Sequence, residues 1–271
     1  MLFGKERQKV ARAIRDLVVR PKLNATASDG DLGGGLQILA RLAASPLRLV
    51  PQSASRIPSM LRELGERRRA IPPARRLAPD PVLALQALTG CLSSDEILRA
   101  RYLNLLAASM DRATSRQVHP GFLTVLRQLT PDETRIFSRF ENDGPYPVLS
   151  VQSHPKHGGN RQTELRHFSL LGEEAGCEHP SRAPLYLDNL CRLGLTELRA
   201  TRLSEDTRMF KPLEAHAEVT NLIARIASRP PVTDGTTSDP LVADVQYKYL
   251  FVTSFGRQFY DACEYRPEAD L

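Results

Sequence analysis

The chain of 271 residues is 41% hydrophobic and 25% charged, which gives it enough apolar material for one large domain or two small ones. We therefore expect a globular protein. The cysteines are scattered and form no CxxC pair, which excludes the dense disulfide framework of a secreted mini-domain and favours reduced thiols in the cytoplasm. They are Cys91, Cys177, Cys191 and Cys263.

The N-terminal residues and the most apolar segment indicate neither export nor a membrane span. The opening run MLFGKERQKVARAI is interrupted by charge before any apolar stretch long enough for a signal peptide. The segment LQILARLAASPLRLV, residues 36–50, is too short for a transmembrane helix and contains Arg41, Pro46 and Arg48. We expect no transmembrane segment, and a cytoplasmic protein whose basic region allows peripheral contact with a membrane.

The basic residues are concentrated in the N-terminal part. The formal net charge of the chain is +6, but residues 1–80 hold 16 Lys and Arg against 7 Asp and Glu, a balance of +9. Residues 1–78 are therefore predicted to be a basic, partly flexible arm whose removal leaves a helical core folded. Such an arm binds nucleic acid or an anionic membrane surface, or is a solvated segment that keeps the protein soluble. The candidate binding residues are Arg67, Arg68, Arg69, Arg75 and Arg76.

Within the arm, residues 32–50 have the spacing of a short amphipathic helix, with Leu32, Leu36, Leu39 and Ala43 on one face. The segment lacks the strong cationic face and the aromatic anchor of a membrane-surface helix. We expect it to pack on the rest of the protein or on a second copy of the chain, so a homo-oligomer or a protein partner is expected.

Residues 79–143 read as a helical core. The first helix is predicted from Pro81 to Gly90, and the second follows a capping box formed by Ser93 and Glu96. A third helix is predicted to start at Pro120, and a fourth at Thr130 with Pro131 in its first turn and Glu133 completing a second capping box.

Polar residues at the junction between these helices, NLLAASMD to HPGF, are expected to be structural. Asp111 and His119 lie at the ends of a short connection, where side chains bond to unsatisfied backbone groups. Asn104 lies inside the second helix and needs a partner if it is buried. No activated nucleophile occurs in the stretch, so we assign no catalytic residue.

The C-terminal region, residues 181–265, suggests a winged-helix-like part. A helix is expected over LYLDNLCRLG, then a short extended piece, then alternating side chains over residues 245–251, then a final helix. Residues 200–244 are the expected insertion, and residues 79–265 form the complete domain. The presumed recognition helix offers only Arg192, with Asp188 and Glu197 near it, which favours partner docking over reading of DNA sequence. The predicted fold class is α+β, mainly helical.

A histidine-rich stretch is weighed as a metal site and set aside. The five potential ligands match no familiar zinc spacing, so we expect a flexible polar loop, no metal and no cofactor. They are His154, His157, His167, Cys177 and His179.

Four runs together resemble, in order and spacing, the Abi-alpha (abortive infection alpha) family of bacterial proteins: LSSDEILRARYLNLLAASMD, VHPGFLTVLRQLTPDETRIF, LDNLCRLGLTEL and LFVTSFGRQFYDAC. The resemblance covers roughly residues 79–263 and implies a part in defence against phage, with no catalytic residue to carry over. Binding or regulated assembly is the expected mode of action. The alternatives are a nucleic-acid-binding regulator that uses the basic arm and an enzyme with a dispersed site.

Overall fold

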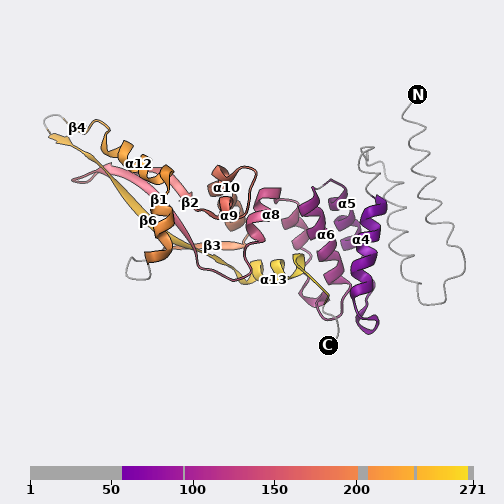
Figure 1. Cartoon of the computed structure of the whole chain (residues 1–271). Helices are drawn as coiled ribbons and strands as arrows, with labels where there is room; N and C mark the ends of the chain where they lie inside the picture. The colour runs from indigo at the N-terminus through magenta and orange to yellow at the C-terminus, as the bar shows by residue number, and fades with distance from the viewer. Residues whose placement is uncertain (1–56, 94, 201–206, 235–236, 268–271) are drawn as a thin grey trace, which may run out of the picture. The chain divides into compact units, whose positions relative to one another are not determined.

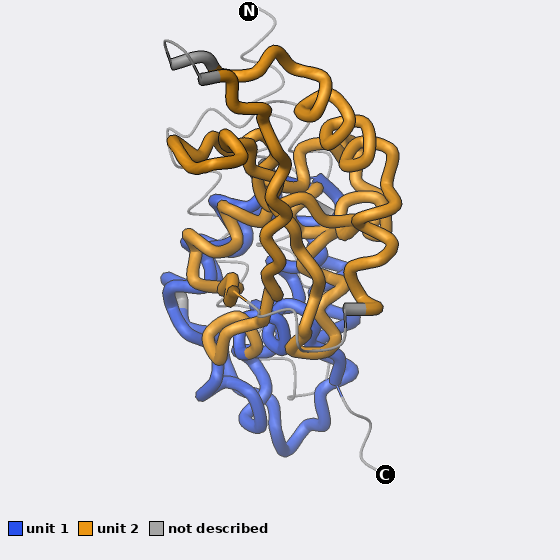
Figure 2. Tube along the Cα trace, turned by 90° about the vertical axis from the view of Figure 1, so that its left-hand side faces the viewer, with its two compact units in different colours: residues 1–131, 258–271 blue, residues 132–257 orange. Residues whose placement is uncertain are grey.

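The computed structural model describes residues 57–93, 95–200, 207–234 and 237–267 (Figure 1). The amphipathic segment predicted at residues 32–50 lies outside these ranges. The chain divides into two compact units, residues 1–131 with 258–271 and residues 132–257 (Figure 2). The mainly helical α+β class predicted from the sequence is confirmed. The winged-helix assignment and the sequence-based domain limits stay predictions.

Unit 1 is helical in its described part. Its main helices are α4 (Ile57–Ala70), α5 (Pro81–Ser93), α6 (Glu96–Ser109) and α7 (Phe122–Leu126), with short 3-10 turns η1 (Pro73–Arg75) and η2 (Ser115–Gln117). Helix α8 (Pro131–Phe137) starts at the last residue of unit 1, and helix α13 (Ser254–Cys263) enters unit 1 at Gln258. The predicted helix starts at Pro81 and near Pro131 agree with these bounds.

Two details of the predicted helices are wrong. Gly90 does not end α5, which continues to Ser93. A Cβ atom at Gly90 would lie 2.5 Å from ring carbons of Tyr102, so glycine is required there by the close approach of α5 and α6. The cap of α6 is Asp95 and not Ser93, because the Asp95 side chain accepts a hydrogen bond from the Leu98 backbone N–H at 2.8 Å.

Helix α4 and the segment after it belong to the core of unit 1. The Met60 side chain is 1% exposed, and Ile71 is fully buried in a cluster with Ala107, Ala108 and Met110. For residues 57–78, this placement contradicts the expectation that the arm can be removed without unfolding the helical core. The physical reason is that apolar side chains of this segment fill part of that core.

Unit 2 contains a four-stranded antiparallel sheet with the order β2-β1-β6-β3. The strands are β1 (Tyr146–Pro155), β2 (Gln162–Phe168), β3 (Thr196–Ala200) and β6 (Leu241–Val252). Strands β1 and β6 pair along their length, from Tyr146 opposite Leu250 to Pro155 opposite Leu241. The loop predicted for the histidine-rich stretch is therefore wrong at His154, which lies in β1, and at His167, which lies in β2, whereas His157, Cys177 and His179 lie between regular elements.

Short helices accompany the sheet. They are α9 (Leu171–Glu174), η3 (Pro180–Arg182), α10 (Ala183–Arg192), η4 (Thr207–Phe210), α11 (Lys211–Glu214) and α12 (Ala217–Ala227). Side chains of α12 form one core with β1, in which Leu149, Val151, Val219 and Ile226 are all fully buried. A second, two-stranded sheet joins β4 (Val232–Asp234) to β5 (Thr237–Asp239). Among the described residues, no helix is long and apolar enough to cross a membrane.

Candidate functional sites

The first candidate site is a buried polar cluster around Asp111, at the end of α6. The Asp111 side chain is fully buried and accepts hydrogen bonds from Arg75 Nε at 3.0 Å and from Arg75 Nη2 at 2.5 Å. It also accepts from the Tyr265 hydroxyl at 2.7 Å and from the Ala113 backbone N–H at 2.9 Å. One carboxylate thereby joins the segment after α4, the end of α6 and the C-terminal segment of unit 1.

The hydrogen bonds at Asp111 favour its charged form. Burial alone would raise the pKa of this carboxyl group, but the bonds from Arg75 and Tyr265 lower the pKa from 3.8 to about 2. Asp111 is therefore a carboxylate at neutral pH and has no proton to donate. Its geometry suits it to holding three chain segments together.

The other two junction residues lie in different surroundings. Asn104 is half-buried, accepts from Arg67 Nε at 2.8 Å and donates through Nδ2 to the Cys263 carbonyl at 2.8 Å. His119 is exposed, and its Nδ1 accepts from the Gly121 backbone N–H at 3.0 Å. His119 is not among the partners of Asp111, so the structure does not bring together the two residues that a simple acid–base pair would need.

The five candidate arginines of the arm divide into two groups. Arg67 and Arg75 bond to the junction as described, and Arg76 donates to the carbonyls of Ile71 and Arg69 at 2.8 and 3.0 Å. These three side chains have structural partners within unit 1. Arg69 is exposed, and Arg68 is half-buried.

The second candidate site lies around His167 in unit 2, a residue that the sequence alone suggests only as a potential metal ligand. His167 is 7% exposed and has a φ of +50°, a backbone conformation that is strained for a residue other than glycine. Its Nδ1 lies 2.7 Å from Asp188 Oδ1, and its Nε2 lies 3.2 Å from Lys248 Nζ. Its backbone N–H donates to Ser150 Oγ at 3.1 Å.

This arrangement selects one tautomer of the His167 ring. The Lys248 ammonium group has only hydrogens to offer, so Nε2 must accept and Nδ1–H must donate to Asp188. Burial lowers the pKa of His167, and the nearby Lys248 and Arg166 act in the same direction, while Asp188 opposes them. The ring is neutral at pH 7 and links β2 and β6 to α10.

Two other histidines of the stretch, His154 and His157, have separate partners, whereas Cys177 and His179 both contact Asp132. The His154 Nδ1 lies 2.8 Å from the Pro155 carbonyl oxygen, and the His157 Nδ1 lies 2.9 Å from Asp239 Oδ1. No group of three or more His, Cys, Asp or Glu side chains within the described ranges has the geometry to hold a metal ion.

A second buried carboxylate is Asp132, at the start of α8. It accepts hydrogen bonds from the backbone N–H groups of Glu178 and His179 at 2.9 and 3.0 Å, and from the Tyr186 hydroxyl at 3.0 Å. Burial opposes ionisation, but these bonds and the one from Arg135 lower the pKa of Asp132. The carboxylate ties α8 to the loop before α10 within unit 2.

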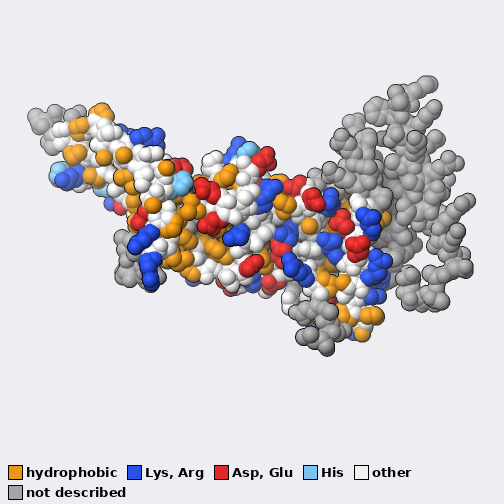
Figure 3. Space-filling view, in the orientation of Figure 1, with side chains coloured by type: hydrophobic (Ala, Val, Ile, Leu, Met, Phe, Trp, Pro, Cys, Tyr) orange, Lys and Arg blue, Asp and Glu red, His pale blue; other side chains and the backbone are white. Residues whose placement is uncertain are grey.

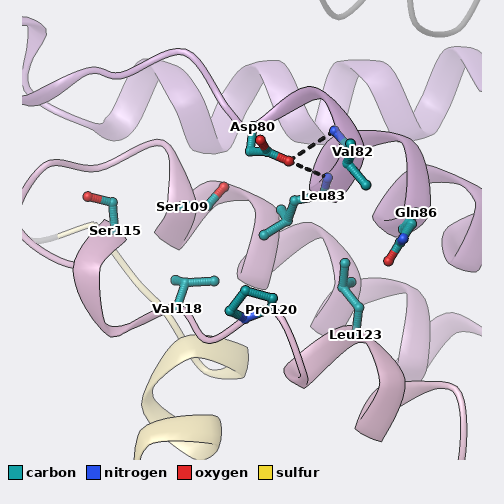
Figure 4. Close-up of a pocket in the computed structure, with 9 residues that line it drawn as sticks. All are labelled: Asp80, Val82, Leu83, Gln86, Ser109, Ser115, Val118, Pro120 and Leu123. Carbon is teal, nitrogen blue, oxygen red and sulfur yellow. Dashed lines mark hydrogen bonds between the residues drawn. The ribbon is translucent and has the colours of Figure 1, made fainter.

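A pocket of about 300 Å³ opens in unit 1 between α5, the end of α6, η2 and α7 (Figure 4). Its one carboxylate, Asp80, accepts from the backbone N–H groups of Val82 and Leu83 at 3.0 and 2.9 Å, and so caps α5. The pocket is better suited to an apolar group than to catalysis. Its lining residues are Asp80, Val82, Leu83, Gln86, Ser109, Ser115, Val118, Pro120 and Leu123.

Comparison with known proteins gives one decisive match. The family model described as abortive infection alpha matches residues 52–263, most of the chain and nearly all of its described part. The chain belongs to the abortive infection alpha family. The resemblance seen in the sequence motifs is thereby confirmed, and membership in the abortive infection alpha family suggests a role related to abortive infection.

The other comparisons add little to this assignment. No curated protein matches this abortive infection alpha chain significantly. A solved structure of an uncharacterized protein from the hydrocarbon-degrading marine bacterium Alcanivorax borkumensis SK2 is 19% identical, with a TM-score of 0.35. The likeness covers 56% of this chain and 96% of that chain, and at this TM-score it carries no argument about fold or function. The His167 cluster lies inside the part of the chain that matches the abortive infection alpha family, as do Asp111 and Arg75, whereas Tyr265 lies two residues beyond it.

Proposed function

We propose that this protein takes part in antiphage defence in the bacterial cytoplasm, and that it acts by binding or regulated assembly. The observation that carries the proposal is the family match over residues 52–263. The polar clusters support a binding role, because Asp111, Asn104 and Asp132 are each engaged by groups of their own unit and hold chain segments in place.

Assembly is further supported by helix α5. Its sequence, PVLALQALTGCLS, contains no charged residue. Two of its apolar side chains nevertheless lie on the surface, with Val82 61% exposed and Leu85 38% exposed. Apolar side chains that are exposed close together are typical of surfaces that contact another protein. A second copy of the chain is the partner that an assembly mechanism requires.

Phage challenge of bacteria that carry the gene tests the proposal. We expect fewer plaques together with death of the infected cells. Val82→Glu with Leu85→Glu should lower both the defence and the sedimentation-measured mass of the purified protein. The matched control is Leu185→Glu with Val232→Glu, which changes side chains of 63% and 48% exposure in unit 2 and should retain both properties. A chain that gives no protection against any phage of a broad panel contradicts the proposal.

A second candidate function is a nucleic-acid-binding regulator. The observation that favours it is the exposure of Arg69 in the arm. An anionic membrane surface is the competing partner for the same charges.

A further inference from the structure

Three exposed arginines of unit 1 come from separate segments of the chain. Arg69 lies in the last turn of α4, Arg112 directly follows Asp111, and Arg116 lies in η2. None of the three has an ion-pair partner within the described ranges, unlike Arg67, which lies near Glu63, and Arg75, which pairs with Asp111. We refer to Arg69, Arg112 and Arg116 as the arginine patch.

Backbone contacts bring the three segments together. Arg76 and Asp111 form an antiparallel β-bridge, and the Arg112 backbone N–H donates to the Arg75 carbonyl at 2.8 Å. The Arg76 guanidinium group bonds to the Arg69 carbonyl at 3.0 Å, which links the end of α4 to the bridge. The Ser115 backbone N–H donates to the Asp111 carbonyl at 2.7 Å, so Arg116 follows one turn later.

The charge at this place is positive. The Asp111 carboxylate is buried and faces Arg75 and Tyr265, so it offers little negative potential to the surface. Figure 3 shows that basic side chains gather along α4, with acidic ones between them. Glu66, one turn before Arg69 on that helix, is the exposed acid nearest to Arg69 along the sequence.

We propose that the arginine patch binds the backbone phosphates of a nucleic acid duplex. A guanidinium group presents a planar fork of donors that matches phosphate oxygens, and such contacts give affinity without sequence readout. This surface includes Arg112 and Arg116, which lie outside the basic arm. The inference goes beyond the defence proposal and does not rest on it.

The side chains exposed elsewhere favour a duplex over the other polyanions. The large apolar side chains exposed in the described part of the chain are Val, Leu and Met, and none is aromatic. Single-stranded nucleic acid is usually held by stacking on aromatic rings, and membrane-surface segments usually carry aromatic anchors. A duplex requires neither, since its phosphates alone supply the contacts.

The test is a titration of the full chain against labelled duplex DNA, labelled duplex RNA, and vesicles of phosphatidylserine and phosphatidylcholine, at about 50 and about 200 mM salt. The test variant is Arg69→Gln, Arg112→Gln and Arg116→Gln together. The matched control removes three other exposed arginines, Arg127→Gln, Arg139→Gln and Arg182→Gln, and so makes the same change in net charge. Thermal melting of both variants checks that they are folded.

The expected result is binding to a duplex that weakens with salt. Each phosphate contact contributes about 0.9 to the slope of log affinity against log salt concentration on duplex DNA. The rise from about 50 to about 200 mM salt should therefore weaken binding by the unmodified chain about 40-fold more than binding by the triple variant, which has lost three contacts. The control variant should bind within about twofold of the unmodified chain. Absence of duplex binding at low salt, equal losses in the two variants, or binding to the vesicles alone would each overturn the proposal.

Discussion

Replacing Asp111 by Asn tests whether the buried cluster in unit 1 holds that unit together. The substitution keeps the shape of the side chain but removes the charge that faces Arg75, whose side chain is 27% exposed. Breaking a buried ion pair by changing one partner costs about 3–5 kcal/mol, and partial exposure of Arg75 places the expected loss near 3 kcal/mol. For a chain of this size, that loss lowers the melting temperature by about 6–12 °C.

Urea unfolding of the purified full chain measures this loss. Arg75→Gln should cost a comparable amount, and the double variant should cost less than the sum of the two, since both single changes break the same pair. The control is Glu96→Gln, which removes a carboxylate whose side chain is 89% exposed and should leave unfolding unchanged. If Asp111→Asn unfolds at the same urea concentration as the unmodified protein, the structural role of the cluster is wrong.

The pH dependence of stability gives a second measurement of the same cluster. The pKa of Asp111 is about 2 in the folded protein and ordinarily 3.8, so the unfolded chain takes up the proton first as the pH falls. The stabilisation by Asp111 is therefore complete above about pH 4 and is lost as the pH falls toward 2. The free energy of unfolding of the Asp111→Asn variant should lack this part of the decline at low pH.

Three further outcomes follow from the structure. Gly90→Ala should destabilise the protein by about 1–3 kcal/mol, because the new methyl group meets the Tyr102 ring at 2.5 Å. Gly65→Ala in α4, with open space around its Cβ, should instead stabilise the protein by about 0.4–1 kcal/mol. Urea unfolding measures both changes, and an unchanged stability of Gly90→Ala would contradict this prediction. NMR of the His167 ring should show the proton on Nδ1 and a pKa below 6.5, and the Lys248→Met variant should raise this pKa. Because the folded pKa is lowered, the contribution of His167 to stability should be lost as the pH falls below about 6.5. A ring that is protonated at pH 7 would refute the assignment. Asp132→Asn should destabilise the protein by about 1–3 kcal/mol, because its amide cannot accept all the hydrogen bonds that the carboxylate receives; a variant with an unchanged unfolding midpoint would argue against the role given to this carboxylate.

Local signals in the sequence predict the helices well and the contacts between distant segments poorly. Pro81 and Pro131 mark helix starts because proline fits the first turn, and this preference can be read without knowledge of the fold. Gly90 looks like a helix end by the same rules. Its actual role depends on Tyr102, a packing partner that no local rule supplies.

The sheet of unit 2 illustrates the same limit. Strand β1 lies between β2 and β6, and a continuous run of four residues, 148–151, is buried within it. Burial on both faces removes the alternation of polar and apolar residues by which strands are recognised. Its partner β6 begins at Leu241, far along the chain, so no residue near β1 in the sequence indicates that β1 pairs with β6.

The candidate sites depend on the same long-range pairing. Asp111 was singled out from the sequence, but its partners Arg75 and Tyr265 lie 36 and 154 residues away. His167 meets Asp188 and Lys248 across 21 and 81 residues. Residue type alone marks which groups need partners when buried, and the fold decides which partners they find.

The central claim, that this chain acts in abortive infection, is tested most directly by infecting cells that carry the gene with more phage than cells. We predict that the infected cells die while the number of phage released per cell falls well below that of cells without the gene. The Asp111→Asn variant, measured beside it, should lose protection only in proportion to the folded protein that remains. Survival of the infected cells, or an unchanged phage yield for every phage tried, would contradict the account.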